Sequence, residues 1–245
     1  MEKRGQIALY VIIAILLVGA IAIVVFTQRE AMKLQPAAQK AEIAPITSFV
    51  EDCIKSTGED ALIYVGQRSG YSVLPKNSID SYAYYFMDNK SYFPSKETIE
   101  QQISLYMNDM LPYCTKNFES FPDFEISADP KAIETTTAIL PTAVRFDVKW
   151  SVPIKKGEIT YNANEFSVDI PSRLSTIYSV MQNITNEQMQ DFSSICFSCI
   201  INLAIENDVY INMDNYDNIT VIFTITDKNQ QIKDRPYEFT FLNKY

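Results

Sequence analysis

Residues 7–26 read IALYVIIAILLVGAIAIVVF, an apolar run that begins at Ile7, ends at Phe26 and contains no charged side chain. A helix rises ~1.5 Å per residue, so this run would be about 30 Å long, the thickness of the hydrocarbon core of a bilayer. A secretory signal peptide has a shorter apolar core and a small-residue cleavage site, which the polar sequence after Phe26 lacks. The run therefore predicts a transmembrane helix that anchors the chain in membrane lipid.

The residues that flank the run predict its orientation. Lys3 and Arg4 precede it in a short tail that is easily held in the cytoplasm, whereas a long domain can be translocated whatever its charge. We therefore expect a single-pass signal-anchor in the cell membrane, with a cytoplasmic N-terminus and an extracellular C-terminal domain. Sequons at Asn89, Asn183 and Asn218 agree with this orientation, because glycosylation is confined to translocated domains.

The composition after the run is that of a folded, acidic body. The formal net charge of the chain is −9, which excludes nucleic-acid binding by neutralisation of phosphates. The chain has only 6 glycines, which argues against phosphate-cradling loops, and no histidine, which excludes Ser-His-Asp and Cys-His catalytic sets. We therefore expect no catalytic residue, no metal ligand and no cofactor.

The periodicity of apolar residues predicts an α+β fold. After a juxtamembrane helix or linker over residues 27–44, helical spacing extends over residues 45–122. Strand alternation is clearest over residues 144–152 and turns back through Lys156-Gly157. We therefore expect an extracytoplasmic domain of helices and antiparallel strands, in which the region 123–245 either joins 45–122 in one body or stands apart.

Local signals place further boundaries within these regions. Ser95 is expected to cap a helix, and Gly58 is expected to interrupt the helix that precedes it. The tyrosine-rich segment 71–94 reads as irregular, and Thr185-Asn-Glu-Gln188 reads as a capping box that opens a helix. Three strands are expected to close the chain, over residues 209–213, 219–226 and 237–242, with turns at 214–217 and 227–229.

The four cysteines allow three pairings. Cys53 and Cys114 each lie on the apolar stripe of a predicted helix, so a bridge between them is natural if those helices pack antiparallel. Cys196 and Cys199 form a Cys-x-x-Cys motif about two turns inside the helix that the capping box opens. A redox centre needs a helix N-terminus, so a structural bridge or two buried thiols is favoured there. A four-cysteine zinc site would require a second pair of closely spaced cysteines, which the sequence lacks.

Tyr82, Tyr84, Tyr85 and Tyr92 form the densest group of tyrosines in the chain. Tyrosines in such a group usually fill a core or an interface. The alternative is a surface that contacts sugars or proteins.

The junction Lys3-Arg4-Gly5-Gln6 directly before the apolar run resembles the class III signal of archaeal type IV pilin-like proteins. A peptidase cuts those proteins after the glycine, so the resemblance implies processing between Gly5 and Gln6 and assembly into a filament. Gln6 and Ala8 match the mature start of one archaeal subset, whereas Tyr10 stands where that subset carries a glutamate.

The body carries a second set of motifs. These are Pro45-x-x-x-Phe49-Val50-Glu51-Asp52-Cys53-Ile54, Gly66-Gln67-x-x-Gly70-Tyr71, Leu111-Pro112-x-Cys114 and Tyr237-x-Phe239-x-Phe241. They resemble single-pass membrane proteins of small-genome archaea to which no activity is assigned. The resemblance implies that Cys53 and Cys114 form a structural pair.

Three functions follow as hypotheses. The first is a membrane-anchored cell-surface structural or binding protein without a catalytic site. The second is a pilin-like filament subunit processed after Gly5, whose partners are other copies of itself or other surface proteins. The third is a surface thiol-disulfide oxidoreductase that uses Cys196 and Cys199.

Overall fold

The computed structural model describes residues 42–192 and 194–245. The apolar run, the Gly5-Gln6 junction and most of the juxtamembrane stretch lie outside the described residues. The chain divides into two compact units, Met1–Ile46 and Thr47–Tyr245. Within the described ranges, no helix is both long enough and apolar enough to cross a membrane.

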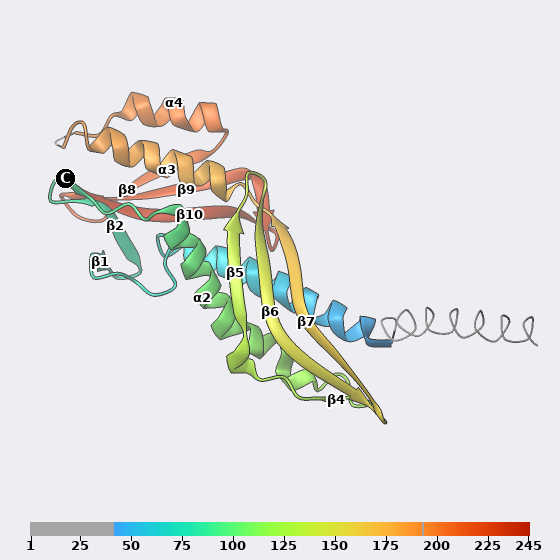
Figure 1. Ribbon diagram of the computed structural model, residues 1–245. Coiled ribbons are helices and arrows are strands. Elements are labelled where there is room, and N and C mark those ends of the chain that lie inside the picture. The colour runs from blue at the N-terminus through green and yellow to red at the C-terminus, as the bar shows by residue number, and fades with distance from the viewer. Residues whose placement is uncertain (1–41, 193) are drawn as a thin grey trace, which may run out of the picture. The chain divides into compact units, whose positions relative to one another are not determined.

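The second unit is α+β, as predicted, and contains two β-sheets (Figure 1). Its helices are the segment 42–66, which begins in the first unit, α2 (Lys96–Thr115), α3 (Leu174–Gln188) and α4 (Phe197–Asn207). The predicted start of α2 is confirmed, because the side chain of Ser95 accepts a hydrogen bond from the Thr98 backbone N–H at 3.1 Å. Pro112 lies inside the last turn of α2, which ends three residues later at Thr115.

Gly58 does not interrupt helix 42–66, contrary to the sequence-based expectation. A Cβ atom at Gly58 would lie 2.7 Å from Cδ1 of Ile170 and 3.0 Å from the ring of Phe146. These two side chains belong to β7 (Ile159–Pro171) and β6 (Ala143–Lys156). Glycine at this position therefore allows the helix to pack closely on the sheet, which offsets a helix propensity about 1 kcal/mol poorer than that of alanine.

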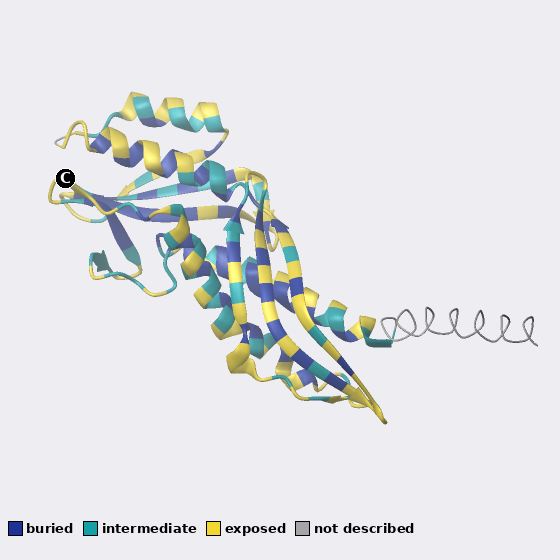
Figure 2. Cartoon of the chain, viewed as in Figure 1, coloured by how far each residue is buried: buried dark blue, intermediate teal, exposed yellow. Residues whose placement is uncertain are grey.

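The smaller sheet is built around the predicted hairpin. Strands β6 and β7 pair along nearly their whole length and turn at Gly157, which has a positive φ of 59°. On the other edge of β6 lie β4 (Glu125–Ile126) and β5 (Glu134–Ile139). Burial alternates residue by residue along β6, as Figure 2 shows, so one face of the sheet packs inward and the other meets solvent.

Helix α2 covers the outer edge of β5 with side chains that replace a neighbouring strand. Three backbone N–H groups of β5 donate to one face of α2: Thr135 to Asn108 at 2.9 Å, Thr137 to Ser104 at 3.1 Å and Ile139 to Glu100 at 2.7 Å. The three acceptors are spaced four residues apart, which places them on one side of the helix. This edge of the sheet therefore presents few unpaired donors to another strand.

The larger sheet differs from the prediction in two respects. Its strands are β1 (Ser78–Ile79), β2 (Tyr82–Met87), β3 (Lys90–Ser91), β8 (Tyr210–Asn215), β9 (Thr220–Ile232) and β10 (Arg235–Lys244), and their order is β1-β2-β10-β9-β8 with β3 on β2. The segment 71–94, predicted to be irregular, thus supplies three strands. In addition, β2 pairs with β10 in parallel, so this sheet is mixed rather than wholly antiparallel.

The prediction of a turn at Asp227-Lys228-Asn229 is also wrong, because these residues continue β9. The chain reverses instead at Lys233 and Asp234, whose φ angles are 50° and 61°. Two successive positive φ angles are the signature of a hairpin turn that matches the twist of its strands.

Helix α3 lies against the apolar face of the larger sheet (Figure 1). Phe223, Ile225, Phe239 and Phe241 point to this face and are fully buried. Helix α3 in turn buries the side chains Ile177, Val180, Met181 and Ile184. The core therefore forms between α3 and the C-terminal hairpin, while α4 lies outside α3.

Replacing Gly66 with alanine is expected to lower the free energy of unfolding by about 2–3 kcal/mol, as overpacking does in other cores. A Cβ atom there would lie 2.6 Å from the backbone carbonyl oxygen of Glu238, which cannot rotate away as a side chain could. In an open helix the same change would stabilise, because alanine is the better helix former.

Denaturant unfolding of Gly66→Ala against Gly157→Ala checks this expectation. A Cβ at Gly157 meets nothing within 4 Å, so that variant carries only the cost of its positive φ, about 1 kcal/mol. Equal losses in the two variants would contradict the close packing of Gly66 on β10.

Candidate functional site

The four cysteines form two bridges, Cys53–Cys114 and Cys196–Cys199. The first confirms the pairing expected for the two N-terminal helices and joins helix 42–66 to α2, with Cα atoms 5.6 Å apart. Cys53 is buried and Cys114 is partly exposed. The second bridge joins residues only three positions apart and is the more unusual feature.

The location of Cys196 and Cys199 corrects the sequence-based expectation. The predicted capping box does not exist, because α3 runs through Thr185, whose buried hydroxyl donates to the Met181 carbonyl oxygen at 3.0 Å. A new helix, α4, begins only at Phe197, with Cys196 as its N-cap residue. The pair therefore lies at a helix N-terminus and not two turns inside a helix.

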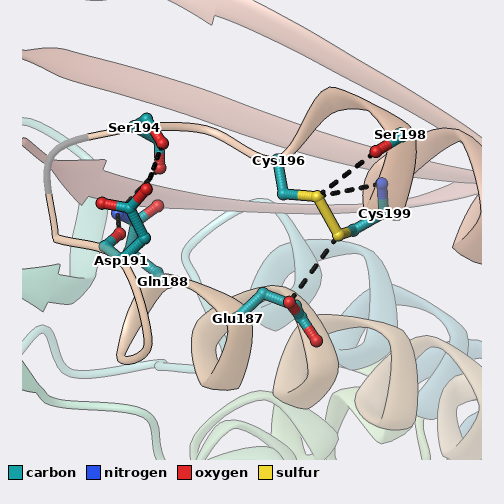
Figure 3. The surroundings of a disulfide bond; sticks show 7 residues. All are labelled: Glu187, Gln188, Asp191, Ser194, Cys196, Ser198 and Cys199. Atoms are coloured by element: carbon teal, nitrogen blue, oxygen red, sulfur yellow. Dashed lines mark hydrogen bonds between the residues drawn. A yellow bond between two sulfur atoms is a disulfide. The ribbon is translucent and has the colours of Figure 1, made fainter.

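This position gives the two sulfur atoms different surroundings (Figure 3). The backbone N–H of Cys199 donates to Sγ of Cys196 at 3.2 Å. A helix N-terminus carries partial positive charge, so reduction of the bridge would leave Cys196 as the sulfur that is better stabilised as a thiolate.

Glu187, on the last full turn of α3, faces the other sulfur. Its Oε2 atom lies 3.7 Å from Sγ of Cys199, within reach of the thiol proton that reduction would create. The carboxylate disfavours a second negative charge beside it. The arrangement can therefore support an attacking thiolate at Cys196 and a protonated partner at Cys199.

The connection between α3 and α4 is held by hydrogen bonds within it. Gln188 donates through Nε2 to the backbone oxygens of Asp191 at 2.7 Å and Ser194 at 3.4 Å, and the Ser194 hydroxyl donates to the Asp191 carboxylate. These bonds, drawn in Figure 3, fix the approach of the chain to Cys196.

The bridge opens into a cavity of about 360 Å³ between the α3–α4 connection and the larger sheet. Phe223 of β9 and the C-terminal Tyr245 line its sheet side, and Ile184 and Leu203 line its helical side. Burial raises the pKa of Tyr245 to about 12, so its hydroxyl stays neutral at physiological pH. The cavity is thus partly apolar, with Glu187 and Asp191 contributing negative charge at its margin.

An apolar stripe follows directly from the bridge along the outer face of α4. Phe197, Ile201 and Ile205 lie on successive turns and are 61%, 57% and 73% exposed. Ile200 is the only residue of this helix that the structure buries among those described. Helix α4 has one polar stripe, at Ser198, Asn202 and Glu206, and is apolar elsewhere, so its pattern alone does not show which of its apolar residues face the core.

The remaining candidate residues lie apart from the bridge. The sequon residues Asn89, Asn183 and Asn218 are all exposed, the first in the turn before β3, the second on α3 and the third before β9. Of the tyrosine group, Tyr84 and Tyr85 are buried, Tyr82 is partly exposed and Tyr92 is exposed. The group thus divides between core filling and surface.

Among the residues in the described ranges, no three or more acidic or cysteine side chains gather as a metal site would require. Comparison of the chain with protein-family models, with curated proteins and with solved structures finds no match.

Proposed function

We propose that this protein is a membrane-anchored cell-surface protein whose folded body serves a structural or binding role outside the cytoplasm. The observation that carries the proposal is the uncharged run 7–26 directly after Lys3 and Arg4. The two disulfides support it, because such bridges persist in oxidising compartments. The exposed sequons agree with it as well.

Membrane extraction and protease accessibility test this proposal. The intact chain should stay in the membrane fraction through high-salt and alkaline washes, and protease added to whole cells should digest the body. A variant with Ile13→Lys and Leu17→Lys should appear in the soluble fraction, because a charge at the centre of a spanning helix is costly. Release of the unaltered chain by alkali would refute anchoring, and resistance to protease in intact cells would refute the orientation.

The Lys3-Arg4-Gly5-Gln6 junction favours the filament subunit as a special case of this function. Mass spectrometry of the mature protein distinguishes the two. A chain that begins at Gln6 supports pilin-like processing, whereas a chain that retains Met1 or Glu2 rules it out.

The position of Cys196 at the N-cap of α4 favours a second candidate, thiol–disulfide exchange. Once an external dithiol has reduced the Cys196–Cys199 bridge, the Cys196 thiolate would attack one sulfur of a partner's disulfide and release the other sulfur as a thiolate. The Cys199 thiol would then lose its proton to Glu187 and attack Sγ of Cys196. This attack releases the partner sulfur that was bonded to Cys196. The partner gains two electrons, and the chain regains its Cys196–Cys199 bridge.

Cys199→Ser is expected to trap a mixed disulfide with a peptide disulfide substrate, visible on non-reducing gels, whereas Cys196→Ser is not. Glu187→Gln should slow release of the mixed disulfide without preventing its formation. The Cys53–Cys114 bridge is the internal control, since Cys53 is buried and should stay oxidised under mild dithiothreitol. A Cys196–Cys199 bridge that is equally inert to the dithiol would eliminate this candidate.

A further inference from the structure

The larger sheet has a second face, which α3 does not cover. Residues in direct register across β8, β9 and β10 point to the same side, and the neighbours of Phe223 and Phe239 along each strand point to the opposite side. That side carries Asp214, Thr224, Glu238 and Thr240. They line a cavity of about 620 Å³, which we call the polar groove.

The walls of the polar groove come from two other segments. Tyr64 near the end of helix 42–66 and Arg68 in the turn after it form one wall, and Tyr82 of β2 forms part of the other. The turn is held firmly against β2, because Ser69 accepts the Ala83 N–H through its hydroxyl at 2.9 Å and the Tyr85 hydroxyl through its carbonyl at 2.9 Å. The groove is therefore a built feature of the fold.

Arg68 provides a donor for which the fold supplies no acceptor. Its Nε atom is buried and makes no hydrogen bond. Its guanidinium lies 4.9 Å from the centre of the Tyr64 ring, which holds the side chain in place. The enclosed Nε lies beyond the reach of a ligand, so the donors that Arg68 can offer in the groove are its two terminal Nη groups.

The two carboxylates provide acceptors. Asp214 accepts a hydrogen bond from the Asn212 side chain at 2.6 Å, and Glu238 accepts one from the Thr226 hydroxyl at 3.4 Å. Within the described ranges, neither carboxylate nor Arg68 takes part in an ion pair. Each carboxylate can accept several hydrogen bonds, so both retain capacity for a ligand's hydroxyl groups.

We propose that the polar groove binds a neutral sugar residue of a glycan. A sugar hydroxyl both donates and accepts, which matches a groove that offers Glu238 and Asp214 as acceptors, Arg68 as a donor and the hydroxyls of Thr224 and Thr240 as both. The C–H face of a sugar ring needs an aromatic surface, which Tyr82 provides at the wall. A phosphate group would be repelled by the two carboxylates. An apolar ligand would bury the polar lining without giving it hydrogen-bond partners.

Sugar binding in the polar groove depends neither on membrane anchoring nor on chemistry at Cys196 and Cys199, and so is a property beyond the proposed function. The two sites also use opposite faces of the larger sheet. Sugar binding can therefore be lost or retained independently of both.

The test uses the full chain, purified in a detergent without a sugar headgroup. An array of cello-, chito-, malto- and galacto-oligosaccharides identifies the best binder, which is then titrated by calorimetry. Glu238→Gln and Asp214→Asn should each weaken binding about tenfold or more, because each removes a charged acceptor from the ligand's hydroxyls. Both side chains are exposed, so the fold should tolerate the changes.

Glu134→Gln on β5 is the matched control, an exposed carboxylate on the other sheet, and should bind as the unaltered chain does. Tyr82→Phe should keep most of the affinity, whereas Tyr82→Ala should lose it, since only the first retains the ring. Absence of binding to every oligosaccharide on the array would overturn the proposal. So would a titration that neither Glu238→Gln nor Asp214→Asn alters, or a groove that binds basic peptides instead.

Discussion

Replacing both Cys53 and Cys114 with alanine is expected to lower the free energy of unfolding by about 4 kcal/mol, the loop-closure entropy of a bridge of this span. The bridge joins residues 61 positions apart and so restricts a large part of the unfolded chain. For a body of about this size, such a loss corresponds to a melting temperature lower by roughly 10 °C. Chemical unfolding of the two proteins at equal ionic strength measures the difference.

The double variant Cys196→Ala/Cys199→Ala is the matched control, because its bridge spans only three positions. It should cost much less, since a short loop restricts the unfolded chain little. Equal losses in the two double variants would contradict a structural role that is special to the longer bridge.

Replacing Arg173 with methionine is expected to cost about 3 kcal/mol, because it leaves a buried carboxylate without its charged partner. Nη1 of Arg173 donates to Oδ1 of Asp227 at 2.8 Å, and Asp227 is fully buried. Nη2 of the same guanidinium donates to the Asn207 carbonyl oxygen at 2.6 Å. One side chain therefore ties the start of α3 to the end of α4 and to β9.

A double-variant cycle isolates this interaction. Arg173→Met combined with Asp227→Asn should cost less than the sum of the two single changes, since the second change removes the stranded charge. Arg145→Met is the control, because the Arg145–Asp169 pair is exposed and its loss should change stability little. Strict additivity in the Arg173–Asp227 cycle would show that the ion pair contributes nothing.

The elements that the sequence predicted well are those whose signals are local. Ser95 caps α2 through its own side chain, and the alternation of β6 is complete because one face is buried and the other wet. The turn at Gly157 needs a positive φ, which glycine adopts readily. Each of these features depends on residues close in the chain, so the sequence pattern alone is sufficient to predict it.

The elements that it missed depend on distant partners. β2 pairs with β10, more than one hundred positions later, and Ala83 to Phe86 are all buried, so no alternation marks the strand. Gly58 remains helical because Phe146 and Ile170 approach it. Thr185 resembled a cap, but its hydroxyl bonds back to Met181 inside a continuous helix.

The candidate sites show the same division. The sequence shows the Cys196-x-x-Cys199 motif but not its place at a helix N-terminus, because the pattern predicts a helix start at Thr185 and the helix begins at Phe197. The polar groove could not be predicted at all. Its lining comes from Tyr64, Arg68, Tyr82, Asp214 and Glu238, and no sequence pattern links these segments before the sheet brings them together.

The Cys53–Cys114 bridge also has a mechanical consequence. A pull applied to the chain on the N-terminal side of Cys53 crosses the bridge to Cys114 without passing through the residues between them. Those residues hold about 200 Å of extended chain, at ~3.5 Å per residue. This length bears no load while the bridge is intact, so reduction would add up to about 200 Å to the extension of the chain under force.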